Sequence, residues 1–209
     1  MQPFTNHTGV VAPLDRVNVD TDSIVPARFL KRIERTGWGE FLFCDWRYRP
    51  DGSSDPHFEL NAPEYQAATI LVAGRNFGSG SSREHAVWAL SQHGFRAVVA
   101  PSLADIFHKN CLENGLVPVL LPEEQVNAVM ARAQVSPGYR LTVDLERCEV
   151  WDDEGFRAAF KVHADPQTHR FRRYCLLNGL DEINLTLHHE DKIAAYERRR
   201  WPARFASQS

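Results

Sequence analysis

A glycine- and serine-rich segment, residues 74–86 (GRNFGSGSSREHA), carries the side chains best suited to chemistry. Its glycines allow left-handed backbone angles and a close approach to a ligand, so that successive N–H groups can point into one concavity. Arg83 adds a positive charge, and Ser81 and Ser82 add two hydroxyl groups. The sequence therefore predicts an anion site with hydroxyl groups at its rim.

Three common glycine-rich motifs do not match this segment. A phosphate-binding P-loop needs a lysine, a dinucleotide fingerprint needs glycine where Arg83 stands, and no register gives the nucleophile pattern G-x-S-x-G. Arginine beside two serines suits a carboxylate instead, because the planar guanidinium can bind both carboxylate oxygens. A structural alternative is a helix cap, since Ser81 and Glu84 have the spacing of a capping box.

The segment lies between a predicted strand and a predicted helix. Residues 69–73 form an apolar run of strand length, and the helix is expected from about residue 82 to 93, ended by Gly94. Apolar strands that alternate with helices predict a parallel sheet buried on both faces, with ligands at the carboxyl ends of its strands. The further units expected are strands at 97–100 and 116–121 and helices at 103–113 and 122–133.

The chain is less regular on either side of this core. The amino-terminal part is expected to hold a strand at 10–14, a polar loop at 18–22, an amphipathic stretch at 27–35 and a strand at 40–44. Paired strands are expected at 140–145, 148–151 and 156–162, followed by helices at 166–177 and 190–201. We therefore expect a single α/β domain of 209 residues with a helical C-terminal extension from about residue 166.

Composition excludes several classes of protein. The 24 basic and 27 acidic residues leave a net charge of −3, which argues against nucleic-acid binding. No apolar run reaches the length of a membrane span, and the first residues do not resemble a signal peptide, so a cytoplasmic location is expected. The four cysteines form no C-x-x-C pair, so we interpret them as reduced thiols and expect no metal or cofactor bound by this chain.

Residues 78–86 (GSGSSREHA) resemble the signature of the swivelling domain of the aconitase superfamily. More closely, nearly the whole chain is similar to the small subunits of bacterial 3-isopropylmalate dehydratases, and Asn184, where glycine would be expected, is a minor departure. This resemblance implies a swivelling β/β/α domain with a parallel strand–helix core, as in the C-terminal domain of aconitase. The supporting segments are 18–26 (NVDTDSIVP), 45–47 (DWR), 105–111 (DIFHKNC), 176–181 (LLNGLD) and 189–191 (HED).

The same resemblance implies a hydro-lyase that isomerises 2-isopropylmalate to 3-isopropylmalate, by dehydration and rehydration, in leucine biosynthesis. The chain would be active only in a heterodimer with a large subunit that holds a 4Fe-4S cluster. Ser81 would be the catalytic base. Ser82 and Arg83 would bind the hydroxy-dicarboxylate substrate, with Asp22 at the edge of the site. Among the basic residues of 27–39 we expect Arg28 to meet a substrate carboxylate, with Lys31 and Arg32 as alternatives.

Substrate selection is expected to depend on residues 27–39. Phe29, Leu30, Ile33 and Trp38 could contact an isopropyl group. One alternative function is the small subunit of a related dehydratase acting on 2-methylmalate (citraconate) or another 2-hydroxy acid, because one methylene changes binding by only about 1–3 kcal/mol. A second alternative is a carboxylate-binding regulatory module without catalysis. Activity in the presence of a large subunit distinguishes this module from either dehydratase.

Overall fold

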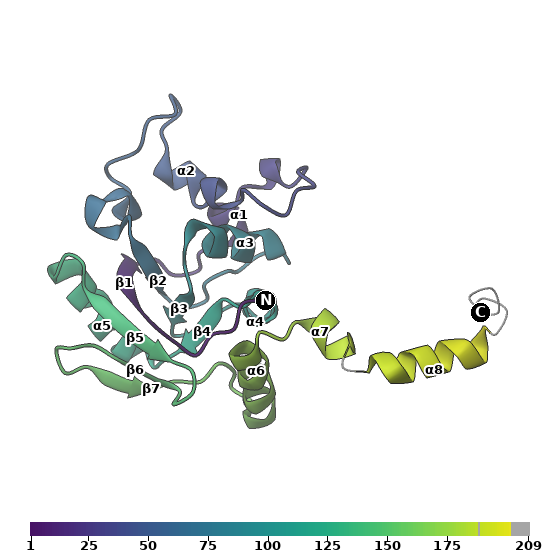
Figure 1. The fold of residues 1–209 in the computed structure, drawn as a ribbon. Helices are drawn as coiled ribbons and strands as arrows, with labels where there is room; N and C mark the ends of the chain where they lie inside the picture. Colours follow the sequence, from purple (N-terminus) through teal and green to yellow (C-terminus); the bar gives the residue numbers. More distant parts are fainter. Residues whose placement is uncertain (188, 202–209) are drawn as a thin grey trace.

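Seven strands form one sheet in the described part of the chain, in the order β4-β3-β2-β1-β5-β6-β7 (Figure 1). The computed structural model describes residues 1–187 and 189–201. Strands β4, β3, β2 and β1 run parallel to one another, which confirms the parallel core predicted from the apolar runs. These strands are β1 (Asn6–Leu14), β2 (Ala68–Ala73), β3 (Ala97–Ala100) and β4 (Val117–Leu120).

Strand β1 joins the parallel half of the sheet to an antiparallel half. It pairs in parallel with β2 on one side and antiparallel with β5 on the other. The antiparallel half continues from β5 through β6 to β7, which confirms the three paired strands expected after residue 138. These strands are β5 (Arg140–Asp144), β6 (Glu149–Trp151) and β7 (Arg157–Ala159).

The parallel strands are buried on both faces. Successive side chains of a strand point to opposite faces, so Ile70 and Val72 join one apolar cluster, whereas Leu71 and Ala73 join the other. Helix α5 contributes to the first cluster, and α3 and α4 contribute mainly to the second. The three helices are α3 (Glu84–His93), α4 (Asp105–Asn114) and α5 (Glu123–Val135), close to their predicted positions.

Short helical turns fill the region between β1 and β2. The expected strand at 40–44 is wrong, because Phe43 has a left-handed φ of +51° that interrupts any extended run. The amphipathic stretch at 27–35 contains one short 3-10 turn. The short helices are α1 (Thr21–Ile24), α2 (Cys44–Arg47) and four 3-10 turns, η1 (Ala27–Phe29), η2 (Gly39–Phe41), η3 (Glu59–Asn61) and η4 (Pro63–Tyr65).

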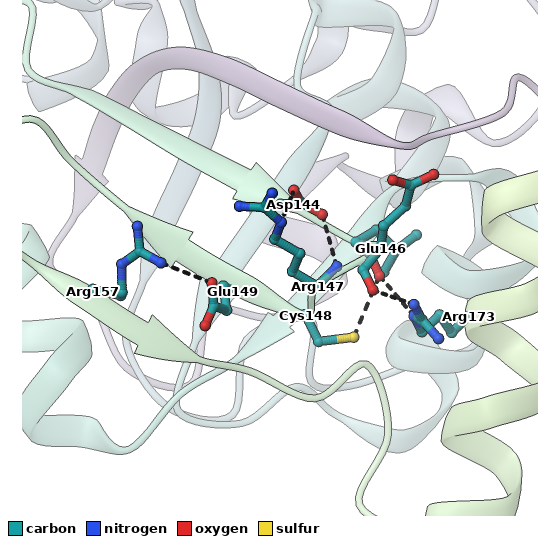
Figure 2. Close-up of polar contacts among 8 residues, drawn as sticks. Asp144, Glu146, Arg147, Cys148, Glu149, Arg157 and Arg173 are labelled. Carbon is teal, nitrogen blue, oxygen red and sulfur yellow. Dashed lines mark hydrogen bonds and ion pairs between the residues drawn. The ribbon is translucent and has the colours of Figure 1, made fainter.

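Helix α6 (Pro166–Asn178) packs beside the antiparallel half of the sheet. Its Arg173 donates through Nε to the carbonyl oxygen of Leu145 at 2.8 Å and through a second nitrogen to that of Glu146, both in the β5–β6 turn (Figure 2). Leu176 is fully buried and its carbonyl oxygen accepts a hydrogen bond from Phe4 N at 3.0 Å. These contacts fix α6 to the body of the domain.

Two further helices, α7 (Glu182–Leu187) and α8 (Glu190–Arg200), extend away from the sheet (Figure 1). Helix α8 matches the predicted final helix, whereas α7 was not predicted. Neither helix contains a buried residue among those described. No helix in residues 1–187 and 189–201 combines the length and apolar character that a membrane span requires.

Candidate functional site

The loop after β2, residues 74–83, lies between the loops that follow β1 and β3. Isolated parallel bridges join Ser79 to Asp20 on one side and Phe77 to Leu103 on the other. The pairing of the parallel strands therefore continues beyond their ends and orders the loop. This places residues 81–83 at the carboxyl end of the parallel sheet, where the sequence predicts a ligand site.

Gly78 lets the loop pass close to α4. A Cβ atom at this position would lie 2.1 Å from Cγ of Phe107, and its φ of +79° also favours glycine. The N–H groups of Gly78 and Ser79 both donate to the carbonyl oxygen of Val19, at 2.7 and 3.1 Å. The sequence predicted that the N–H groups of this loop would be free to bind an anion. Two of them instead bind the carbonyl oxygen of a neighbouring loop, so that prediction is wrong for these two groups.

Helix α3 begins after the two serines. Its N-terminal cap residue is Arg83, and the Glu84 carboxylate accepts a hydrogen bond from Asn114 Nδ2 at 2.8 Å. The capping-box interpretation is therefore wrong, and the predicted start at about residue 82 was two residues early. Ser81 and Ser82 remain exposed directly before the positive end of the helix dipole, where negative charge is stabilised.

Thr21 holds Ser81 from the opposite loop. The Thr21 side chain is almost completely buried, and its Oγ1 donates to the Ser81 carbonyl oxygen at 3.2 Å. The same oxygen lies 3.4 Å from Ser81 Oγ, and Thr21 N donates to Ser79 O at 2.8 Å. Sequence reasoning missed Thr21, because its burial depends on how two distant loops pair. The only signal was its place beside Asp22 in residues 18–26, one of the segments on which the resemblance rests.

Arg83 forms an ion pair with Asp22. The Asp22 carboxylate also accepts a hydrogen bond from Ala27 N at 3.2 Å. The hydrogen bond from Arg83 holds the pKa of the Asp22 carboxyl below its usual range, so Asp22 stays ionised at neutral pH. The positive charge predicted at Arg83 is therefore largely balanced by Asp22.

Arg28 lies in a groove beside this cluster rather than within it. Its guanidinium binds both oxygens of Asp45, one of them at 2.9 Å, and lowers the pKa of that carboxyl. Both residues line an open groove of about 810 Å³, which Ser81–Arg83 do not line. The structure thus brings Ser81, Arg83 and Asp22 together, leaves Ser82 exposed beside them, and places Arg28 on a neighbouring surface.

The apolar side chains expected to select the substrate differ in accessibility. Phe29 lines the groove and stacks on Phe41 with ring centroids 4.2 Å apart, while Ile33 is 93% exposed. Trp38 is completely buried and packs against His85 at a centroid distance of 4.5 Å. Contact between Trp38 and an isopropyl group is therefore excluded in this conformation.

The four cysteines lie in different surroundings. Cys44, Cys111 and Cys175 are buried, and all four thiols are free. Cys148 sits in the β5–β6 turn, where its sulfur lies 3.4 Å from the carbonyl oxygen of Leu145 (Figure 2). In the part of the chain that the structure describes, no three His, Cys, Asp or Glu side chains are grouped so as to hold a metal ion.

Three family models match consecutive parts of this chain. The family model described as "Aconitase C-terminal domain" matches residues 1–124. A model described as "LeuD_N" matches residues 127–164. A third model, which describes the C-terminal domain of the 3-isopropylmalate dehydratase small subunit, matches residues 182–204.

Two curated relatives agree with these matches. The 3-isopropylmalate dehydratase small subunit of Brevibacillus brevis is 58% identical over 96% of this chain and 100% of its own length. That of Geobacillus kaustophilus is 56% identical over 97% of this chain and 99% of its own. The chain belongs to the family of 3-isopropylmalate dehydratase small subunits.

A solved structure shows the same fold. The crystal structure of 3-isopropylmalate dehydratase from Methanocaldococcus jannaschii superimposes with a TM-score of 0.62 at 24% identity, covering 92% of this chain and 99% of the other. The resemblance to a swivelling aconitase-type domain is thereby confirmed. Membership in a small-subunit family implies a large subunit as partner, and the aconitase superfamily implies an iron–sulfur cluster on that large subunit.

Proposed function

We propose that this chain is the small subunit of a hydro-lyase that isomerises 2-isopropylmalate to 3-isopropylmalate in leucine biosynthesis. The observation that carries this proposal is 58% identity over nearly the full chain to a protein named as such a subunit. A biosynthetic role also agrees with the cytoplasmic location expected from the sequence. The two relatives described above are named for 3-isopropylmalate and not for the alternative substrate, 2-methylmalate.

We propose that Ser81 acts as the base in this reaction. Dehydration removes a proton from the carbon next to a carboxylate and the hydroxyl group from the neighbouring carbon, and rehydration returns both in exchanged positions. We assign the proton to Ser81 Oγ. Ser81 can accept it only after its hydroxyl group has released its own proton to solvent, and the N-terminus of α3 supplies fixed positive charge that stabilises the resulting oxyanion.

Substrate carboxylates are proposed to bind to the two arginines and to Ser82. Arg83 is already paired with Asp22, whose side chain is 56% exposed and can give way to a carboxylate of the substrate. Arg28 is paired with Asp45 in the same manner, and both of those side chains are half-exposed. When a substrate carboxylate takes the place of Asp22 or Asp45, the arginine keeps a charge-assisted hydrogen-bond partner, so its charge is not left unpaired.

The residues of this chain do not fit an iron–sulfur cluster. Such clusters are usually held by several cysteine thiolates, whereas three of the four cysteines here are buried, Cys111 within the second apolar cluster and Cys44 beside Arg28. Burial raises the pKa of each thiol, which opposes formation of the thiolate. We therefore propose that the 4Fe-4S cluster belongs to the large subunit and that this chain is active only in complex with it.

The test is reconstitution with a large subunit. The purified chain alone should contain no iron and show no turnover of 2-isopropylmalate, and adding the large subunit should give activity. Ser81→Ala should then lower kcat by about 10³-fold, within the range for loss of a general base. Ser79→Ala is the matched control, because Ser79 lies in the same loop as Ser81 and its hydroxyl donates to the carbonyl oxygen of Asn18, in the loop after β1. Undiminished activity of Ser81→Ala would disprove the catalytic assignment.

The same complex tests the substrate. Turnover of 2-isopropylmalate and 2-methylmalate is measured side by side under identical conditions. A higher kcat/KM for 2-methylmalate would replace the proposed substrate while leaving the reaction type intact. Activity that never appears with any large subunit would favour the non-catalytic carboxylate-binding module.

A further inference from the structure

Exposed apolar side chains concentrate in residues 182–201, which include α7 and α8 and which we call the C-terminal arm. Of the 12 large apolar side chains exposed in the described residues, five lie in this arm. They are Ile183, Leu187, Ile193, Tyr196 and Trp201. An apolar surface that is concentrated in this way usually marks a binding surface.

The arm lacks the packing that normally stabilises a helix. Helix α8 has 11 residues, a length at which an isolated helix is marginal in water, and none of them is buried in the described structure. Ile193 and Tyr196 are three residues apart and therefore share one face of the helix. A surface that covers this face would supply the missing packing.

The residues at the start of the C-terminal arm are fixed to the body of the domain. Helix α6 ends at Gly179, which has a left-handed φ of +66°, and Leu180 N donates back to Cys175 O at 2.9 Å. A Cβ atom at Gly179 would lie 2.9 Å from Cγ of Pro3, so the chain turns tightly against the first residues. Asp181 then caps α7 by accepting from Asn184 N at 2.8 Å. The arm therefore leaves the body in a defined direction, away from the sheet (Figure 1).

The family matches point to the partner that covers the arm. Residues 1–124 match the C-terminal domain of aconitase, which by its name is one part of a longer chain. Residues 182–204 instead match a domain named for the small subunit of 3-isopropylmalate dehydratase. A domain within one chain is held to the rest of its enzyme covalently, whereas a separate subunit needs additional interface. Residues 127–164 also lie outside the aconitase match and match the model described as LeuD_N, and the arm is the segment whose model is named for the small subunit.

We propose that the C-terminal arm docks on the large subunit through the face that carries Ile193 and Tyr196. This inference rests on the proposed function, because it assumes that the large subunit is the partner. The arm contains four acidic and four basic residues, a balance that favours a protein surface over a strongly anionic membrane or nucleic acid. Docking through the arm would keep the swivelling domain attached while its site loop meets the substrate.

The test compares two aspartate substitutions in α8. Ile193→Asp introduces a charge on the apolar face, and Ala195→Asp introduces the same charge two residues away, at an exposed position on another face. Large subunit is titrated into each full-length variant, and binding is measured by calorimetry. Ile193→Asp should weaken association by about tenfold or more, whereas Ala195→Asp should stay close to wild type. Equal affinity of Ile193→Asp and wild type would overturn the proposal.

A second substitution and a measurement of stability distinguish loss of docking from loss of folding. Tyr196→Ser removes an exposed aromatic side chain from the same face of α8 and should also weaken association. Thermal unfolding of the isolated chain should be the same for wild type and all three variants, because none of these side chains is buried in the body. Loss of association together with unchanged unfolding supports docking by the arm.

Activity separates this inference from the proposed function. At saturating large subunit, Ile193→Asp should keep the wild-type kcat, while Ser81→Ala should bind normally and lose kcat. A wild-type chain that neither binds nor activates the large subunit would contradict the proposed function itself. Sedimentation of the isolated chain tests whether the arm binds a second copy instead. If the wild-type chain is a dimer and Ile193→Asp is a monomer, the arm covers a second copy and the proposal is wrong.

Discussion

The hydroxyl oxygen of Thr21 lies 3.4 Å from that of Ser81 and donates to the Ser81 carbonyl oxygen at 3.2 Å. Thr21 is almost completely buried, whereas Ser81 is exposed at the end of a glycine-rich loop. The buried Thr21 side chain thus adds a hydrogen bond to a loop carbonyl oxygen that also accepts from Arg83 N at 2.8 Å. We expect Thr21 to position Ser81 without touching the substrate.

Replacing Thr21 by valine tests this relationship. Thr21→Val keeps the shape of the side chain but removes the hydroxyl, so kcat should fall by about 10²-fold, as displacement of a reacting group by about 1 Å can do. KM should change little, because Ser82 and Arg83 remain. Steady-state kinetics of the reconstituted complex give both values.

The conservative variant distinguishes positioning from general stability. Thr21→Ser restores a hydroxyl and should recover most of the lost kcat, even though it removes a buried methyl group. A valine variant with wild-type kcat, or a serine variant as slow as valine, would contradict the positioning role.

Arg83 should affect substrate binding through the geometry of its side chain. Arg83→Lys keeps the positive charge but loses the planar fork that binds two carboxylate oxygens. KM for 2-isopropylmalate should rise by about tenfold, in line with loss of one charge-assisted hydrogen bond. Arg75→Lys is the control, since Arg75 lies exposed in the same loop and pairs with Glu123 at 3.7 Å. A similar rise in KM for both variants would indicate a nonspecific effect of the loop.

The parallel core could be predicted from sequence because its signal is local. Ile70 and Leu71 are consecutive apolar residues that face opposite sides, and both are fully buried, as a sheet covered on both faces requires. The glycines at 78 and 80 likewise predicted left-handed backbone, and both have positive φ. In each case the residue type itself imposes the structure.

Features that depend on distant contacts were missed. The strand expected at 40–44 has the composition of a strand, but Leu42 and Phe43 are buried in the second apolar cluster by helical turns. The burial of Thr21 and the pairing of Arg83 with Asp22 depend on two loops separated by about 60 residues. No local pattern encodes such a contact, so the sequence could indicate which residue types meet at the site but not how they pair.

The close approach of Gly78 to Phe107 should make alanine costly at this position. Gly78→Ala places a Cβ atom 2.1 Å from the Phe107 ring in addition to the strain of a φ of +79°. Overpacking and backbone strain should together lower the free energy of unfolding by about 2–4 kcal/mol. Urea denaturation of the isolated chain measures this loss.

Gly52 supplies a matched control for this substitution. Its φ of +84° is nearly the same, but a Cβ atom there would meet nothing within 4 Å. Gly52→Ala should therefore cost only the backbone strain, about 1–2 kcal/mol. Equal destabilisation by the two alanines would mean that the Phe107 contact relaxes without cost.

Histidine burial should make the stability of the chain depend on pH. His108 Nε2 donates to the Val162 carbonyl oxygen at 2.6 Å, and His169 Nδ1 accepts from Val162 N at 3.2 Å. The accepting Nδ1 must be unprotonated, and burial lowers the pKa of both imidazoles. The native state therefore binds fewer protons than the unfolded chain, whose histidines have a pKa of about 6.5.

The sign of the pH effect follows from this difference. A lowered native pKa stabilises the fold fully above about pH 6.5, and this stabilisation is lost as pH falls through the native pKa. The urea midpoint should therefore decrease when pH is lowered from about 7 to 5, a range above the usual pKa values of carboxyl groups. His169→Gln should flatten this dependence, because the amide oxygen of glutamine can accept from Val162 N but does not titrate. His57→Gln, at an exposed position, controls for the loss of an imidazole, and an equal effect of the two variants would refute the assignment to His169.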